Sequence, residues 1–164
     1  MKEFTVALAG NPNCGKSTIF NALTGAQQHV GNWPGKTVEK KEGSFIHNSK
    51  KIKVVDLPGT YSLSAFSQEE VIARDFILNE KPDVVVAVVD STNLERNLYL
   101  VVQLLELGSD VIVDLNMSDL AESDQIKIDT DKLAYALNSE IIKTTGCKDE
   151  GVDELKALLA AKHQ

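Results

Sequence analysis

Apolar runs of strand length alternate along the chain with stretches in which apolar residues recur at helical spacing. Short runs rich in Val and Ile and bounded by turn residues are typical of strands buried in a sheet. Five runs of this kind predict strands at residues 4–9, 53–56, 84–89, 111–115 and 141–143. Residues 38–47 carry alternating charges, and we expect them to form an edge strand that its charges keep from pairing with other chains.

Helical spacing predicts five helices between these strands, at residues 16–24, 68–79, 94–107, 130–137 and 152–161. Strands that alternate with helices are typical of βαβ units. We therefore expect an α/β fold of three layers, with a mostly parallel sheet of about six strands between two layers of helices. No internal repeat or linker interrupts the pattern, so residues 1–164 are expected to form a single domain.

Composition narrows the range of partners. Lys and Arg number 17 against 24 Asp and Glu, a net charge of −7, which argues against a nucleic-acid surface. The two cysteines cannot form a disulfide framework, and neither they nor the three histidines have the spacing of a metal site. The longest apolar run, residues 84–89, is far shorter than the roughly 20 residues that span a bilayer, and the N-terminus is predicted as a strand, so we expect a soluble chain.

Residues 10–17 match the phosphate-binding pattern G-x-x-x-x-G-K-[ST], directly after a predicted strand and directly before a predicted helix. Its glycines let backbone N–H groups point inward, and the following helix presents its positive end to a phosphate. We expect Lys16 to reach the β and γ phosphates and Ser17 to bind Mg²⁺. The plainer alternative is a glycine turn with an exposed lysine. The nucleotide-binding residues predicted in this loop are Asn13, Cys14, Gly15, Lys16, Ser17 and Thr18.

A second motif, D-x-x-G, closes the predicted strand at residues 53–56. Asp56 lies where Mg²⁺ needs an outer-shell carboxylate, and Gly59 can offer its N–H to the γ phosphate. Asp56, Ser17 and Lys16 are therefore expected at one cavity.

Asn116, Met117 and Asp119 follow the predicted strand at residues 111–115 and resemble the N-K-x-D element of Ras-like GTPases, with Met in place of Lys. A carboxylate at position 119 accepts hydrogens from guanine N1 and N2, whereas adenine would leave it unpaired. Asp119 therefore favours a GTPase over an ATPase, although an ordinary helix cap is the alternative for this residue alone. A second base loop is expected at residues 144–148, where Gly146 and Cys147 replace the Ser-Ala of the usual S-A-x-[KR] and the match is poor; Gly146, Cys147 and Lys148 are its predicted nucleotide-binding residues.

With these motifs in place, the sequence resembles the cytoplasmic G domain of the ferrous-iron transporter family FeoB, a Ras-like P-loop GTPase. Residues 31–39 read GNWPGKTVE, similar to the first switch of that family with Lys36 as a departure, and residues 56–63 resemble its second switch. The resemblance covers essentially the whole chain. It implies a GTP- and GDP-binding domain at the cytoplasmic face of the cell membrane, whose partners are a helical spacer and a transmembrane region not present in residues 1–164.

The resemblance also implies roles for single residues. Thr37 is placed as the switch threonine that binds Mg²⁺ and touches the γ phosphate, so that Lys16, Thr37 and Gly59 form the catalytic set. Asn13 is placed as a ligand of K⁺. Thr60 stands where Ras-like enzymes carry a glutamine, so we expect slow intrinsic hydrolysis that K⁺ stimulates.

Some questions stay open at this stage. A free-standing GTPase of translation or RNA metabolism is the main alternative, which the negative charge disfavours. Trp33 fits a stacking role and simple packing equally well. Asp114 interrupts an apolar strand and would need a partner or partial exposure. Self-association of the domain is also left open.

Overall fold

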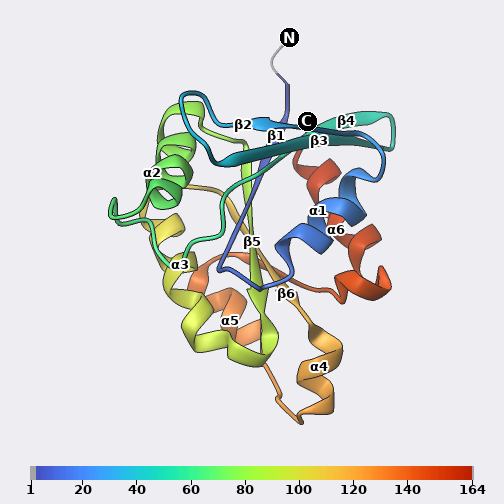
Figure 1. The fold of residues 1–164 in the computed structure, drawn as a ribbon. Helices are drawn as coiled ribbons and strands as arrows, with labels where there is room; N and C mark the ends of the chain where they lie inside the picture. Colours follow the sequence, from blue (N-terminus) through green and yellow to red (C-terminus); the bar gives the residue numbers. More distant parts are fainter. Residues whose placement is uncertain (1–2, 164) are drawn as a thin grey trace.

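A computed structural model describes residues 3–163 and shows a seven-stranded sheet with the strand order β2-β3-β4-β1-β5-β6-β7 (Figure 1). Strands β4, β1, β5, β6 and β7 run parallel, whereas β2 and β3 are antiparallel to their neighbours. The strands are β1 (Thr5–Gly10), β2 (Gln28–Asn32), β3 (Glu39–His47), β4 (Lys50–Asp56), β5 (Val84–Asp90), β6 (Val111–Asn116) and β7 (Glu140–Lys143).

Helices cover both faces of this sheet, which confirms the three-layer α/β prediction. Residues of α2, α3 and α5 pack on one face, and residues of α1 and α6 pack on the other. The helices are α1 (Lys16–Thr24), α2 (Gln68–Asp75), α3 (Leu94–Glu106), α4 (Ser118–Ser123), α5 (Thr130–Leu137) and α6 (Val152–Lys162), with a π-helical turn η1 (Phe76–Glu80) and 3₁₀ turns η2 (Ser91–Asn93) and η3 (Gly146–Lys148). No helix among residues 3–163 is both long and apolar enough to cross a membrane.

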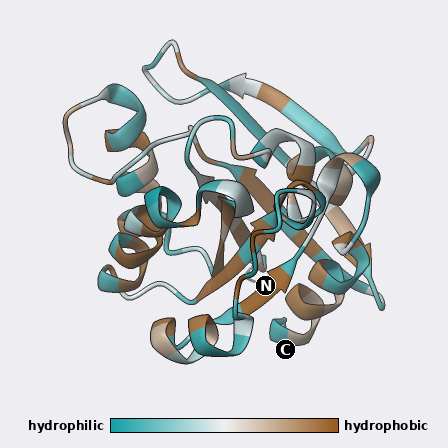
Figure 2. Cartoon of the chain, turned by 90° about the horizontal axis from the view of Figure 1, so that it is seen from below, coloured by the Kyte–Doolittle hydropathy of each residue, from teal (hydrophilic) through white to brown (hydrophobic). Residues whose placement is uncertain are grey.

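The core lies on the two faces of the central strands, and Figure 2 shows their hydrophobic residues enclosed between helices with polar outer faces. Residues of one strand alternate between the two faces, because successive side chains of a strand point in opposite directions. In β5, all six residues from Val84 to Val89 are buried. Continuous burial explains why this strand is visible in the sequence as an unbroken apolar run.

Three sequence predictions need correction. The sheet has seven strands instead of about six, because the polar residues 28–32 form a strand that hydrophobic periodicity does not reveal. The expected helix at residues 68–79 is an α-helix that ends at Asp75 and continues as the π-helical turn η1. The short helix α4 was not predicted, since its six residues contain only two apolar side chains.

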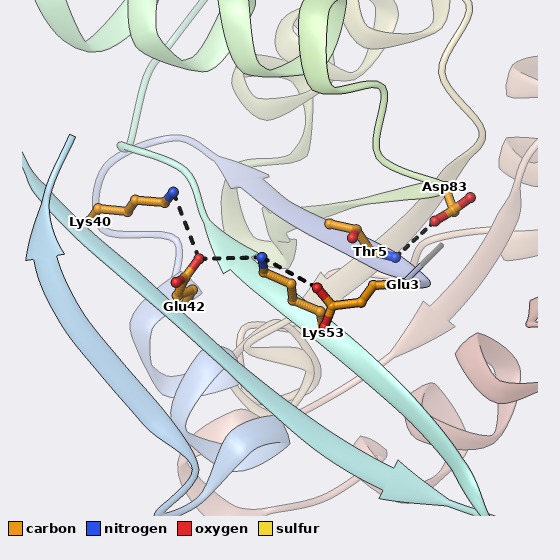
Figure 3. A network of polar contacts seen from close by, with 6 residues as sticks. All are labelled: Glu3, Thr5, Lys40, Glu42, Lys53 and Asp83. Atoms are coloured by element: carbon orange, nitrogen blue, oxygen red, sulfur yellow. Dashed lines mark hydrogen bonds and ion pairs between the residues drawn. The ribbon is translucent and has the colours of Figure 1, made fainter. Parts of the chain in front are cut away.

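The strand at residues 39–47 is also not an edge strand. β3 is hydrogen-bonded to β4 on one side and to β2 on the other, so β2 forms the edge. Its charged side chains form ion pairs within the chain. The Glu42 carboxylate lies 3.7 Å from the ammonium groups of both Lys40 and Lys53, and the Lys53 ammonium lies 3.9 Å from the Glu3 carboxylate (Figure 3). Beside this network, the N–H of Thr5 donates to Asp83 at 2.8 Å, which anchors the start of β1.

The parallel strands bring their carboxyl ends to one edge of the sheet. The loop after β1 begins at Gly10, β4 ends at Asp56, and β6 ends at Asn116. β1 lies between β4 and β5. The strands that follow β1 in the sequence, β2 to β4, therefore lie on one side of it, and the later strands, β5 to β7, lie on the other. In open α/β sheets, ligands bind at the carboxyl ends of the strands beside such a reversal.

Candidate functional site

The loop between β1 and α1 encloses a cavity of about 420 Å³. Gly15 turns the chain into α1 with a φ of 85°, and a Cβ atom at this position would lie 2.3 Å from Nδ2 of Asn116. Only glycine fits this conformation and this space. The cavity is lined by Asn11, Pro12, Asn13, Gly15, Lys16, Ser17 and Gly59.

Lys16 and Asp56 meet at this cavity. The Lys16 ammonium donates a short hydrogen bond to Oδ1 of Asp56, and both side chains are about nine-tenths buried. Burial raises the pKa of the Asp56 carboxyl, and the charge of Lys16 opposes that rise. A cation and a carboxylate are thus held together between the loop after β1 and the end of β4.

The segment after Asp56 is fixed against the same loop. The N–H of Thr60 donates to the carbonyl of Gly10 at 3.0 Å, and Thr60 is buried. A Cβ atom on Gly59 would lie 3.3 Å from the backbone of Pro12, a tight contact that favours glycine here. Gly59 therefore lies directly beside the phosphate-binding motif, as the D-x-x-G spacing predicts.

Asn116 joins the loop after β1 to the loop after β7. Its Nδ2 donates to the carbonyl of Cys14 at 3.1 Å, and its Oδ1 accepts from the N–H of Gly146 at 3.0 Å. A Cβ atom on Gly146 would lie 2.8 Å from Ile19, so this loop packs directly on α1. The motif residues of three distant segments therefore share one wall.

Asp119 lies at the start of α4 and faces the same loop. Its Oδ2 is 3.2 Å from the Lys148 ammonium, and its N–H donates to Oγ1 of Thr145 at 3.3 Å. Although burial opposes the charged form of Asp119, the hydrogen bond from Lys148 holds its pKa below the usual range. The same hydrogen bond raises the pKa of Lys148. Asp119 is therefore a carboxylate at neutral pH.

Other predicted residues differ in how closely they approach this site. A Cβ atom at Gly15 would lie 3.4 Å from the terminal methyl of Met117, and one at Gly146 would lie 3.3 Å from Thr18, so both side chains lie against the site loops. Cys147 is exposed on η3. Thr37 is exposed in the loop between β2 and β3 and does not line the cavity.

Trp33, for which stacking and packing were equally open, is a packing residue in this structure. It is buried, lies edge-on to Phe76 with 5.7 Å between ring centroids, and carries the Lys40 ammonium 4.8 Å above its ring.

Cys14 is buried as well, and burial raises the pKa of its thiol to about 11. A thiol with so high a pKa is poorly reactive at neutral pH.

Four further residues contribute to the candidate site: Asn11 and Ser91, to which the sequence assigned no role, and Thr144 and Thr145 of the predicted second base loop. Asn11 is buried in the cavity wall, and neither its Oδ1 nor its Nδ2 has a partner among the described residues. Ser91 donates to the carbonyl of Asn116 at 2.5 Å. Thr144 and Thr145 hold Asn116 and Asp119 from the loop after β7. Asn11 has a sequence signal, its place inside the glycine motif, whereas Ser91 has none.

No group of three or more His, Cys, Asp and Glu side chains able to hold a metal ion occurs among residues 3–163. The candidate site consists of backbone groups, the buried Lys16–Asp56 ion pair, and single polar side chains at the ends of β1, β4 and β6.

Comparison with known proteins identifies the relatives of this chain. A family model described as ferrous iron transport protein B matches residues 4–159. The Fe(2+) transporter FeoB of Salmonella typhimurium strain LT2 is 50% identical over 160 residues, which make up 95% of this chain and 21% of that protein. The Fe(2+) transporter FeoB of Methanocaldococcus jannaschii is 67% identical over 109 residues, 66% of this chain and 16% of that protein. The matched part of the chain thus spans only about a fifth to a sixth of the length of these relatives.

Solved structures agree with the sequence match. The FeoB G-domain from Methanococcus jannaschii is 51% identical with a TM-score of 0.87, and the match covers 99% of this chain and 98% of that one. The cytosolic domain of the T. maritima FeoB iron transporter in GDP form II is 45% identical with a TM-score of 0.96, covering 99% of this chain and 64% of that one. The chain belongs to the ferrous iron transport protein B (FeoB) family.

Proposed function

We propose that this chain is the GTP-binding and GTP-hydrolysing regulatory domain of a ferrous-iron transporter, located at the cytoplasmic face of the membrane. The observation that carries the proposal is the bridge made by Asn116, which ties the phosphate-binding motif at Cys14 to the base loop at Gly146. A nucleotide lying across this bridge would place its phosphates at Lys16 and its base at Asp119. Family membership favours the transporter over the alternative of an RNA-associated GTPase.

The phosphate end of the site is suited to a magnesium nucleotide. The backbone N–H groups at the start of α1 and the Lys16 ammonium supply positive charge to the phosphates. The Ser17 hydroxyl and the Asp56 carboxylate are oxygen donors of the kind that Mg²⁺ prefers, and the buried Asp56 is held at the same cavity. When bound, Mg²⁺ would neutralise charge that develops on the transferred phosphate.

At the base end, Asp119 would accept the two hydrogens of guanine N1 and N2 and so reject adenine. Its present partner, the Lys148 ammonium, is exposed and can move aside for the base. Met117 and the backbone of Gly146 and Cys147 would line the remaining edges of the purine.

Hydrolysis would depend on backbone groups, because Thr60 has no side-chain amide that could orient water beside the γ phosphate. Gly59 lines the cavity, and its N–H would position the phosphate, while Thr37 would close over it when GTP is bound. Asn13 lines the cavity with a left-handed φ of 67° and would hold K⁺ beside the phosphates. We therefore expect slow hydrolysis that is faster in K⁺ than in Na⁺, and equal rates at matched ionic strength would exclude a role for Asn13 in K⁺ binding.

Nucleotide titration tests the core of the proposal. The native chain should bind GDP in the presence of Mg²⁺ and should bind ADP far more weakly. Asp119→Asn should lower the preference for GDP over ADP by at least about tenfold, since a carboxylate that pairs with the base contributes a charge-assisted hydrogen bond. Asp124→Asn, an exposed residue at the end of the same helix, is the matched control and should leave both affinities unchanged. Tighter binding of ADP than GDP by the native chain would refute the guanine assignment.

A further inference from the structure

Asp114 is a buried acid that the proposed function does not use. It lies in β6 with no exposed surface, between Val88 of β5 and Ile142 of β7. Its Oδ1 lies 2.5 Å from Oγ1 of Thr144, whereas its Oδ2 is buried without a partner among the described residues. A charged carboxylate with one hydrogen bond in such a place is costly, because burial penalises the ionised form far more than the neutral one.

Counting hydrogens shows which form of Asp114 fits. Three oxygens lie in a row: Oδ1 of Asp114, Oγ1 of Thr144 at 2.5 Å, and Oδ1 of Asn116 a further 3.1 Å away. The amide of Asn116 cannot be turned around, since its Oδ1 accepts from the N–H of Gly146 and its Nδ2 donates to a carbonyl. Two hydrogen bonds along the row need two hydrogens, and the Thr144 hydroxyl supplies only one. The second hydrogen can come only from a protonated Asp114.

The protonation state of Asp114 therefore decides where the Thr144 hydroxyl points. When Asp114 is neutral, it donates to Thr144, and Thr144 donates to Asn116. When Asp114 is ionised, it takes the Thr144 hydrogen for itself, and Asn116 loses one of its bonds. Asn116 is the residue that joins the phosphate-binding motif to the base loop.

The surroundings of Asp114 contain few groups that compete with this arrangement. Burial raises the pKa of Asp114 to about 7, and the hydrogen bond from Thr144 opposes that rise. Cys14, whose thiol pKa is raised to about 11, lies close enough to feel the charge of Asp114 and stays neutral. The lysines of the elements on this face have other partners or lie at the surface. Lys16 pairs with Asp56, Lys148 with Asp119, and Lys162 with Asp110 and Glu140, while Lys156 lies over the Phe45 ring. Lys143 is exposed, and so are the acids Asp153 and Glu154 of α6.

We propose that Asp114 is a positioning residue that acts as a neutral acid, freeing the Thr144 hydroxyl to hold Asn116 and, through Asn116, the guanine-nucleotide site. This inference rests on the proposed function, because its effect on binding is exerted at the GDP site. Its consequence is that GDP affinity declines as the pH rises through neutrality, when the Asp114 proton is lost.

The test measures GDP affinity by calorimetry between about pH 5.5 and 8.5 for the native chain and for Asp114→Asn. The asparagine amide donates to Thr144 at every pH, so this variant reproduces the neutral acid. The ratio of the native dissociation constant to that of Asp114→Asn should rise about fivefold over this range, the factor that corresponds to one ordinary hydrogen bond. Because both proteins bind the same nucleotide, the effect of pH on GDP itself cancels in this ratio. Asp124→Asn, which keeps Asp114, should follow the native profile.

A second variant and a spectroscopic measurement complete the test. Thr144→Val breaks the row of oxygens, so it should bind GDP about fivefold more weakly than the native chain at low pH and equally at high pH. Independently of nucleotide, the infrared band of a protonated carboxyl group should be present at pH 6 in the native chain and absent in Asp114→Asn. Absence of that band, or a flat ratio of dissociation constants, overturns the inference about Asp114. Failure of every variant to bind GDP overturns the proposed function instead, and the infrared band still decides the protonation of Asp114.

Discussion

Gly15 shows how much a single residue decides at the candidate site. We expect Gly15→Ala to weaken GDP binding by at least about tenfold, because the new methyl group would displace the Asn116 amide that lies 2.3 Å from its position. Gly108→Ala is a matched control: Gly108 has the same φ of 85°, but a Cβ atom there would meet nothing within 4 Å. Both variants place alanine at the same positive φ, so equal GDP affinities in calorimetry would contradict the steric explanation.

Asp114 also makes a prediction about stability. Its pKa rises from 3.8 in the unfolded chain to about 7 in the folded protein, so the folded state binds more protons between these values. The free energy of unfolding of the native chain should therefore fall, relative to that of Asp114→Asn, as the pH rises from about 4 to about 7. Urea denaturation of both proteins at several pH values measures the difference. A constant difference over this window would show that Asp114 is ionised in the folded state.

For single residues of the candidate site, the sequence predicted the contacts that follow from motifs at strand ends and missed those that depend on strand register. The meeting of Lys16, Asp56 and Gly59 followed from the motifs, because both motifs end parallel strands and such ends share one edge of the sheet. The partner of Asp114 could not be predicted. Thr144 reaches it only through the register of β6 and β7, which pairs Asp114 with Ile142, and no local pattern encodes that register.

Among the elements, the hairpin of β3 and β4 turns through two residues, Asn48 and Ser49, both with positive φ. Such turns favour glycine at the second position, and Ser49, with a φ of 63°, is strained there. Ser49→Gly should raise the free energy of unfolding by about 0.5 kcal/mol in chemical denaturation. Asn48→Gly should change it less, because asparagine tolerates the left-handed conformation. A larger gain from Asn48→Gly would locate the strain at the other residue.

Predictability of the elements followed their burial. The strands β1, β5 and β6 lie inside the sheet with nearly every residue buried, and their apolar runs identified them to within a residue or two. β2 was not predicted because all five of its residues are exposed, so it is held mainly by backbone pairing with β3 and leaves no apolar pattern in the sequence. The break between α2 and η1 was equally invisible, since the apolar spacing continues from Ile72 to Ile77 and carries no sign of the wider turn.

For the molecule as a whole, a ligand that bridges the ends of β1, β4 and β6 should stabilise the entire fold. At a GDP concentration about 100 times the dissociation constant, with Mg²⁺ present, binding adds about 2.7 kcal/mol to the free energy of unfolding. For a domain of this size the melting temperature should rise by roughly 5–10 °C. Differential scanning calorimetry measures the shift, and ADP at the same concentration is the control. An equal shift with ADP would mean that the base loop does not discriminate.

The edge position of β2 limits how the loop that carries Thr37 can move. Gly31 and Asn32 pair with Lys40 and Glu39 at the end of the β2–β3 ladder, and the N–H of Trp33 donates to the carbonyl of Val38 at 2.9 Å. A large movement of this loop must break these backbone hydrogen bonds in order, beginning at the tip of the hairpin. Each further pair that breaks adds to the free energy that the movement requires. The distance that the loop can move is therefore limited by the number of β2–β3 backbone pairs that nucleotide binding can break.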